Sequence, residues 1–223
     1  MMKELHSRPE YKESWTMPRI NSKAPDFEAN TTHGTLRLRD YEGQWLVLFS
    51  HPADFTPVCT TELVSFQKIY HELRRMNTEL LGLSIDSVHA HIAWIKNIEE
   101  NFDVDIEFPV IADLNKDVAM KYGMIMPEES TTETCRAVFI IDDKGKIRSI
   151  IYYPLTTGRN MEEIVRTVHA LQTTDKHGVA TPANWQEGDK VIVPPSTTMK
   201  DVKARDKEEG VECVDWYLCK KDL

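Results

Sequence analysis

The 223-residue sequence has little cysteine, no long apolar run and no excess of positive charge. Its four cysteines are widely spaced and too few for the disulfide-rich scaffold of a small secreted protein. No apolar segment approaches the roughly 20 residues that a helix needs to span a bilayer. The formal net charge of −9 argues against a nucleic-acid surface, because phosphate recognition needs clustered Lys and Arg. We therefore expect a globular protein that binds neither nucleic acid nor membrane.

The ends of the sequence differ in composition from its middle. The opening residues are polar and lack the apolar segment of a signal peptide, so we expect a cytoplasmic location. We divide the chain into an N-terminal arm (1–17), a core (18–172) and a C-terminal extension (173–223). The extension has mixed charge and no clear helical stripe, yet it contains "VIV" and three large aromatic residues. These apolar groups predict packing on a partner subunit rather than disorder.

Buried strands and amphipathic helices alternate along the core. Apolar runs predict strands at 45–50, 79–86 and 108–113. Apolar residues at helical spacing predict helices after Pro57 and around 92–102, 116–122 and 161–171. The runs at 136–142 and 146–153 flank "DDKG", which predicts a β-hairpin. This order predicts an α/β fold with a mixed central sheet between helices, an arrangement that a thioredoxin-like fold satisfies.

The segment "HPADFTPVCTTEL" (51–63) places one cysteine at the expected start of a helix. Thr56 suits the N-cap and Pro57 the first helical position, so Cys59 falls at the third. Unpaired backbone N–H groups and the positive end of the helix dipole favour a thiolate there. The Thr56 hydroxyl can donate to the sulfur or to an oxygen bound beside it, and Pro52 can shield the site from water. We expect a nucleophilic Cys59, against the alternative of an inert buried cysteine.

Two neighbours of this cysteine have more than one interpretation. A thiolate needs a cation, and Arg136 at the start of a predicted strand is a candidate, although such an arginine usually faces solvent. His51 suggests a Cys-His pair but is at least as compatible with a histidine that is hydrogen-bonded beside the strand end. No third member of a hydrolase triad can be assigned.

The cysteine spacing argues against two other classes of site. A zinc site is disfavoured because no CxxC motif is present and because the Cys213/Cys219 gap lacks a nearby histidine. A thioredoxin-type disulfide reductase needs a second cysteine at the helix start, where position 62 holds glutamate. A redox sensor using Cys59, and a binding module in which Cys59 is unreactive, remain alternatives to an enzyme.

The segment "HPADFTPVCTTE" resembles the Pro-x-x-x-Thr-x-x-Cys signature of peroxiredoxins, with Pro52, Thr56 and Cys59 at the signature positions. The form "FSHPADFTPVCTTEL" is similar to the peroxiredoxin-six-type subgroup. The resemblance covers residues 18–220 and continues in order through "SIDSVHAHIAWIKNI", "FPVIAD", "RAVFIID" and "IIYYPLTTGRN". The tail segments "VIVPPSTT" and "CVDWYLC" resemble the longer archaeal and bacterial members.

This resemblance implies a thiol-dependent peroxidase that reduces hydrogen peroxide and organic hydroperoxides. Cys59 would attack a peroxide oxygen and become a sulfenic acid. Thr56 would hydrogen-bond the peroxide, and Pro52 would limit access by water. No metal or organic cofactor is implied.

The resemblance also assigns roles to two arginines. Arg136 matches the family's active-site arginine, which stabilises the thiolate and the charge that develops along the O–O bond. Arg159, in "TTGRN", matches a second arginine that supports the site. Glu62 can position such arginines, although a glutamate on a helix face is usually only solvated.

The C-terminal cysteines resemble those of members that resolve the sulfenic acid as a disulfide. In those members the more C-terminal cysteine comes from a neighbouring subunit, which implies Cys219 as the resolving residue and Cys213 as its exchange partner. The alternative is that both are incidental thiols near the tail. Cys135 matches no family role and is expected to be a packing residue. The implied partners are a dithiol reductant such as a thioredoxin-like protein, and further copies of the chain in a dimer or a decamer of five dimers.

Overall fold

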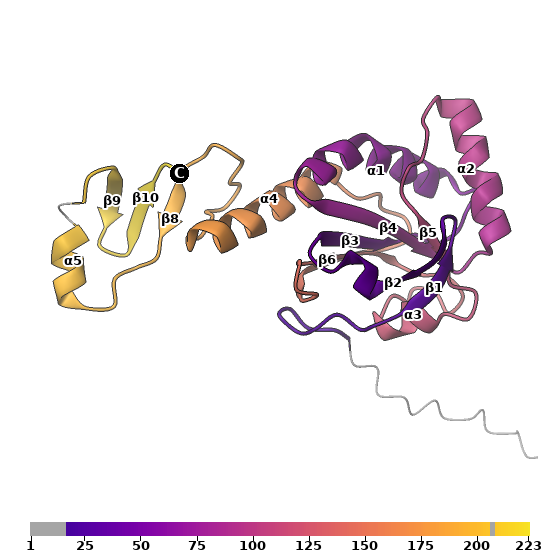
Figure 1. The fold of residues 1–223 in the computed structure, drawn as a ribbon, viewed down its shortest axis with the longest axis horizontal. Coiled ribbons are helices and arrows are strands. Elements are labelled where there is room, and N and C mark those ends of the chain that lie inside the picture. Colours follow the sequence, from indigo (N-terminus) through magenta and orange to yellow (C-terminus); the bar gives the residue numbers. More distant parts are fainter. Residues whose placement is uncertain (1–16, 206–207) are drawn as a thin grey trace, which may run out of the picture.

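The computed structural model describes residues 17–205 and 208–223, so the expected arm at 1–17 lies outside the described residues except for Met17. The core is built on a seven-stranded mixed sheet with the order β2-β1-β5-β4-β3-β6-β7 (Figure 1). Its strands are β1 (Glu28–Thr31), β2 (Gly34–Arg37), β3 (Trp45–Ser50), β4 (Thr78–Ser84), β5 (Val110–Ala112), β6 (Arg136–Ile141) and β7 (Ile147–Tyr153).

The helices lie on both faces of this sheet (Figure 1). They are α1 (Pro57–Arg75), α2 (Val88–Phe102), α3 (Asp117–Lys121) and α4 (Met161–His177), with a short 3-10 helix, η1 (Leu38–Tyr41). Strands β3, β4 and β5 are parallel and are connected through α1 and α2, whereas β6 pairs antiparallel with β3 and with β7. The thioredoxin-like α/β fold with a mixed central sheet is therefore confirmed.

Alternating side chains of β3 divide the core into two layers. Trp45, Val47 and Phe49 pack with residues of α1, α2 and α4 on one face. Leu46 and Leu48 pack with α3 residues and the N-terminal segment on the other face. This period of two is the expected pattern for a strand that is covered on both sides. Because the whole of β3 is buried, its carboxyl end provides a fixed origin for the loop that leads to Cys59.

The first helix is held against β3 by aromatic contacts. The Phe66 ring of α1 stacks on Phe49 with the ring centroids 3.8 Å apart. Each of these side chains is almost completely buried, and such burial stabilises the fold by about 1.5–3 kcal/mol per side chain. The strand and the helix on either side of the 51–56 loop are therefore rigidly connected.

The C-terminal extension has more regular structure than the sequence predicted. Helix α4 continues to His177, so the change in composition at 173 falls inside its last turns. Beyond it lie β8 (Val191–Val193), α5 (Met199–Arg205), β9 (Val211–Asp215) and β10 (Leu218–Lys221). The strands form a three-stranded antiparallel sheet in the order β8-β10-β9, which we did not predict.

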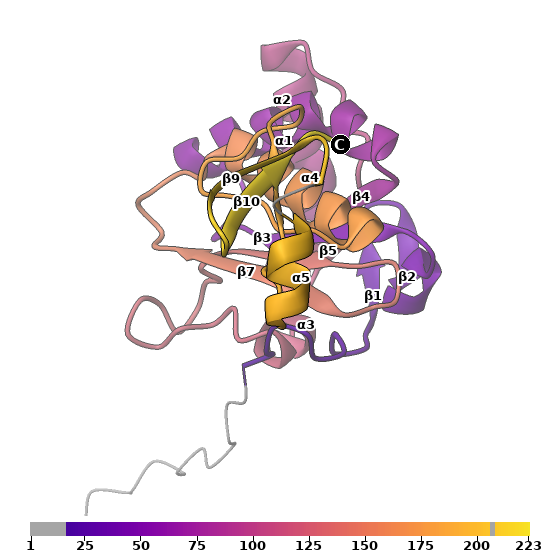
Figure 2. The same cartoon turned by 90° about the vertical axis from the view of Figure 1, so that its left-hand side faces the viewer.

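This second sheet lies beyond the C-terminal end of α4, separate from the seven-stranded sheet (Figures 1 and 2). Trp185 connects the two parts, because its ring is buried against Ala170 of α4 and Val191 of β8. In the described part of the chain, no helix has the length and the apolar character that crossing a membrane requires.

Candidate active site

Cys59 lies in the first turn of α1 with its side chain buried and 1% of its surface exposed. Thr56 occupies the N-cap position in an extended conformation, and Pro57 begins the helix as predicted. The Thr56 side chain does not cap the helix, however. Its hydroxyl donates to the Ala53 carbonyl at 3.0 Å, within the loop that precedes α1.

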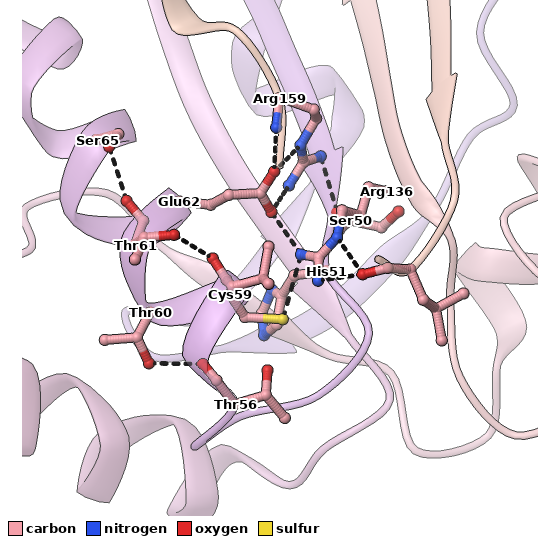
Figure 3. Close-up of polar contacts among 12 residues, drawn as sticks. Ser50, His51, Thr56, Cys59, Thr60, Thr61, Glu62, Ser65, Arg136 and Arg159 are labelled. Carbon is pink, nitrogen blue, oxygen red and sulfur yellow. Dashed lines mark hydrogen bonds and ion pairs between the residues drawn. The ribbon is translucent and has the colours of Figure 1, made fainter. Parts of the chain in front are cut away.

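Arg136 supplies a positive charge next to the sulfur (Figure 3). Its Nη1 donates to Cys59 Sγ at 3.4 Å, and its Nε and Nη2 donate to the Leu155 carbonyl at 2.9 and 2.7 Å. The side chain is 3% exposed, so it does not face solvent as an arginine at a strand start usually does. The strand register of β6 and the chain after β7 thus fix the guanidinium against the helix start.

Glu62 lies one turn beyond Cys59 and connects two arginines (Figure 3). Its Oε2 accepts from Arg136 Nη1 and Arg159 Nη2, each at 2.7 Å. Its Oε1 accepts from the backbone N–H and the Nε of Arg159, each at 2.8 Å. Burial acts to raise the pKa of Glu62, but the hydrogen bonds and charge of Arg159, with the charge of Arg136, outweigh it and lower the pKa. An ionised carboxylate therefore holds both guanidinium groups.

Arg159 is placed one contact further from the sulfur. Its Nη1 donates to the carbonyls of Ser50 and Ala137 at 2.9 and 2.8 Å, at neighbouring ends of β3 and β6. The guanidinium also lies over the rings of Phe49 and Phe66, with Cζ 5.5 and 5.1 Å from the ring centroids. Its contacts join the sheet, α1 and Glu62, and Glu62 in turn contacts Arg136.

The loop 51–56 carries both Pro52, which is buried, and Thr56. The loop is attached to the core by hydrogen bonds at several points: the His51 carbonyl accepts from the Thr134 hydroxyl at 2.7 Å, and the Asp54 N–H donates to Asp86 Oδ2 at 3.0 Å. Asp54 was not predicted from the sequence as part of this site. Its spacing of three residues from His51 was the available signal.

The remaining cysteines have different surroundings. Cys135 is buried beside the start of β6, and burial raises the pKa of its thiol to about 11, so it is a protonated packing residue at neutral pH. Cys213 of β9 and Cys219 of β10 are paired in register and form a disulfide. Cys213 is exposed and Cys219 is buried. The structure therefore joins the two C-terminal cysteines to each other and not to Cys59.

A buried cysteine at a helix start, in contact with a guanidinium and on a thioredoxin-like fold, defines a thiol-dependent redox site. The family model of the AhpC/TSA family matches residues 20–150, and that of the C-terminal domain of 1-Cys peroxiredoxin matches residues 170–209.

Curated relatives and solved structures agree with these matches. A peroxiredoxin of Aquifex aeolicus is 57% identical over 93% of this chain and 98% of its own length. A peroxiredoxin of Methanosarcina mazei is 57% identical over 92% of this chain and 99% of its own length. Among solved structures, a yeast mitochondrial 1-Cys peroxiredoxin is 45% identical with a TM-score of 0.83, covering 93% of this chain and 100% of that one. Peroxiredoxin 6 of Arenicola marina is 39% identical with a TM-score of 0.81, and the match covers 92% of this chain and 97% of that one.

The chain therefore belongs to the peroxiredoxin family, and its relatives include proteins of the peroxiredoxin 6 type. Peroxiredoxins are thiol-dependent peroxidases, so its substrate is a peroxide and its reductant a thiol.

Proposed function

We propose that Cys59 is the sulfur that reacts with peroxide. The observation that carries this assignment is the hydrogen bond from Arg136 Nη1 to Cys59 Sγ at a helix start, because both features favour a thiolate. The thiolate attacks one peroxide oxygen, and the S–O bond forms as the O–O bond breaks. The departing oxygen takes up a proton and leaves as water or as an alcohol, and Cys59 becomes a sulfenic acid.

The neighbouring residues then have separate tasks. Arg136 stabilises the thiolate and the negative charge that builds up on the peroxide oxygens. Glu62 and Arg159 position that guanidinium through the contacts described above. The Thr56 hydroxyl gives its proton to the Ala53 carbonyl, so it accepts a hydrogen bond from the bound peroxide instead of donating one, and the buried Pro52 limits the access of water.

For the resolving step, we assign Cys219 of a neighbouring subunit as the attacking thiol. Its sulfur displaces hydroxide from the Cys59 sulfenic acid, the hydroxide is protonated to water, and a Cys59–Cys219 disulfide forms. Cys213 then attacks Cys219 and releases Cys59, which leaves a Cys213–Cys219 disulfide like the one observed. The exposure of Cys213 supports a last step in which a dithiol reductant, such as a thioredoxin-like protein, attacks this sulfur.

This assignment requires more than one subunit. Val214, Trp216 and Tyr217 are 83%, 51% and 55% exposed in the single chain and lie between the two C-terminal cysteines. Such an exposed apolar group supports a protein interface. We propose a homodimer that assembles into a decamer of five dimers. We propose that it acts in the cytoplasm, where a reducing environment keeps Cys59 and Cys135 as thiols.

The assignment of Cys59 is tested by comparing Cys59→Ser with Cys135→Ser in peroxide consumption with a dithiol reductant. We expect the first variant to lose turnover and the second to retain it, because Cys135 makes no side-chain hydrogen bond to an active-site arginine among the described contacts. Retained turnover in Cys59→Ser excludes it as the nucleophile.

A further inference from the structure

Three buried ionisable side chains form a cluster at the base of the 51–56 loop. Asp54 Oδ1 lies 2.9 Å from His51 Nε2, and Asp54 Oδ2 lies 2.7 Å from His91 Nδ1. The other nitrogen of His91, Nε2, lies 3.0 Å from the Ile111 carbonyl of β5. The three side chains are 0–2% exposed. The cluster therefore joins the end of β3, the loop, α2 and β5.

The Ile111 carbonyl sets the direction of these hydrogen bonds. A carbonyl oxygen only accepts, so His91 carries a proton on Nε2. Burial acts to raise the pKa of Asp54, but the hydrogen bonds from His51 and His91 outweigh it and lower the pKa, which makes Asp54 a carboxylate. A carboxylate also only accepts, so His91 Nδ1 and His51 Nε2 each donate to it. His91 thus holds two protons and forms a buried ion pair with Asp54.

His51 has a different state from His91. Its Nε2 proton goes to Asp54, and burial lowers the pKa of the ring despite the nearby carboxylates of Asp54 and Asp86, so His51 is a neutral imidazole. Its Nδ1 is buried and has no hydrogen-bond partner among the described residues. A buried polar atom without a partner is rare in folded proteins, and a catalytic role is one reason for it to persist.

The spacing within the cluster is that of shared protons rather than of metal ligands. His51, Asp54 and His91 together offer ligand atoms within 4.8 Å of one another. However, two ligand atoms at the usual distance from a tetrahedral zinc ion are about 3.4 Å apart. The observed N···O separations of 2.7 and 2.9 Å are shorter and are ordinary for charge-assisted hydrogen bonds.

We propose that Asp54 and His91 are positioning residues for the reaction with peroxide. Their hydrogen bonds hold His51 with its proton on Nε2 and its Nδ1 as an unprotonated acceptor, and they fix the loop that presents Pro52 and Thr56 to Cys59. This inference rests on the proposed role of Cys59. It adds a requirement that the arginine contacts do not supply, namely a hydrogen-bond chain from β5 to the loop.

The proton positions can be observed directly by neutron crystallography of the perdeuterated full-length protein. We expect deuterium on both nitrogens of His91, on Nε2 alone of His51 and on neither oxygen of Asp54. Deuterium on the Asp54 carboxyl group or on His51 Nδ1 overturns the proposal, as does a metal ion bound by the three side chains. Because the map requires no turnover, this result is independent of the Cys59→Ser test.

Substitutions at Asp54 separate the effect of its hydrogen bonds from the effect of its charge. In Asp54→Ala, His51 and His91 lose their common acceptor and the loop is freed. We expect the rate constant for Cys59 oxidation, measured by stopped-flow fluorescence with hydrogen peroxide, to fall by about 10- to 100-fold. In Asp54→Asn, the amide oxygen accepts from His51 while the amide N–H donates to His91 Nδ1, which then has no proton. This variant loses the charge of Asp54 and reverses the hydrogen bond to His91, but it keeps the proton of His51 on Nε2 and the loop attached to His91, and we expect it to recover most of the rate.

Asp113→Asn is the matched control. Asp113 is another buried carboxylate, directly after β5, but it accepts from the backbone N–H groups of Val118 and Ala119 in α3. We expect this variant to lose stability and keep its oxidation rate. A wild-type rate in Asp54→Ala, or a rate in Asp54→Asn as low as in Asp54→Ala, contradicts the proposal. If Asp54→Ala does not fold, the neutron map and the comparison of Asp54→Asn with Asp113→Asn still decide it.

Discussion

Replacing Glu62 by glutamine tests whether one buried carboxylate holds the active-site arginines. Both oxygens of Glu62 accept from guanidinium N–H groups, so the glutamine NH₂ group faces a donor in either orientation. The substitution also removes the negative charge of Glu62, which offsets the positive charges of Arg136 and Arg159. The glutamate side chain is 4% exposed, so water cannot replace the lost acceptor.

The expected loss of stability follows from this burial. Removing one partner of a buried ion pair lowers the free energy of unfolding by about 3–5 kcal/mol. We expect a value near the lower end, about 3 kcal/mol, because Arg159 keeps its bonds to the Ser50 and Ala137 carbonyls and Arg136 keeps those to Leu155.

Urea unfolding measures this loss in the free energy of unfolding. The protein concentration is kept the same for both proteins, because association of subunits changes the apparent stability. Glu163→Gln is the control: Glu163 also pairs with an arginine, but at 46% exposure its pair contributes about 0–1 kcal/mol. If the two variants are equally stable, the Glu62 carboxylate does not hold the arginines as described.

We also expect the difference in stability between wild type and Glu62→Gln to depend on pH. The pKa of Glu62 is lowered in the fold, so its stabilising effect is complete above its ordinary value of 4.5 and is lost as the pH falls through the folded-state pKa. The difference in stability between wild type and Glu62→Gln should therefore be constant near neutral pH and shrink in acid. A difference that grows as the pH falls contradicts this assignment.

Three further predictions concern the sulfurs. Arg136→Ala should slow Cys59 oxidation by about 10²- to 10³-fold in stopped-flow experiments, since it removes the donor to the sulfur, and an unchanged rate argues against that role. After one equivalent of peroxide, a non-reducing gel should show a disulfide-linked dimer in wild type that Cys219→Ser lacks; loss of the band in Cys213→Ser with its retention in Cys219→Ser reverses the assignment. In the native protein, Cys135 should resist alkylation by iodoacetamide at pH 7, because the pKa of its thiol is raised to about 11. Rapid modification of Cys135 contradicts its description as a buried packing residue.

Features that depend on local sequence were predictable. The start of α1 follows from the rigid backbone of Pro57 after an extended Thr56. The buried strand β3 follows from its unbroken apolar run, which only a sheet covered on both faces accommodates. Both predictions placed Cys59 in the first turn of a helix at the end of a central strand.

Features that depend on contacts between distant segments were not predictable in the same way. Glu62 looks like an ordinary glutamate on a helix face, and its burial depends on Arg159, which lies 97 positions away in sequence. The C-terminal sheet was missed because its strands are short and because β8 pairs with β10 across a long connection, as in the register of Val193 with Cys219. His91 occurs within an amphipathic helix pattern, and nothing in that pattern shows that it faces Asp54.

The central claim is that Cys59 is the sulfur that peroxide oxidises. Mass spectrometry of the Cys219→Ser protein after substoichiometric peroxide, with dimedone present to trap sulfenic acid, tests it most directly. We expect a dimedone adduct on Cys59. Adducts confined to Cys135 or Cys213, with Cys59 unmodified, contradict it.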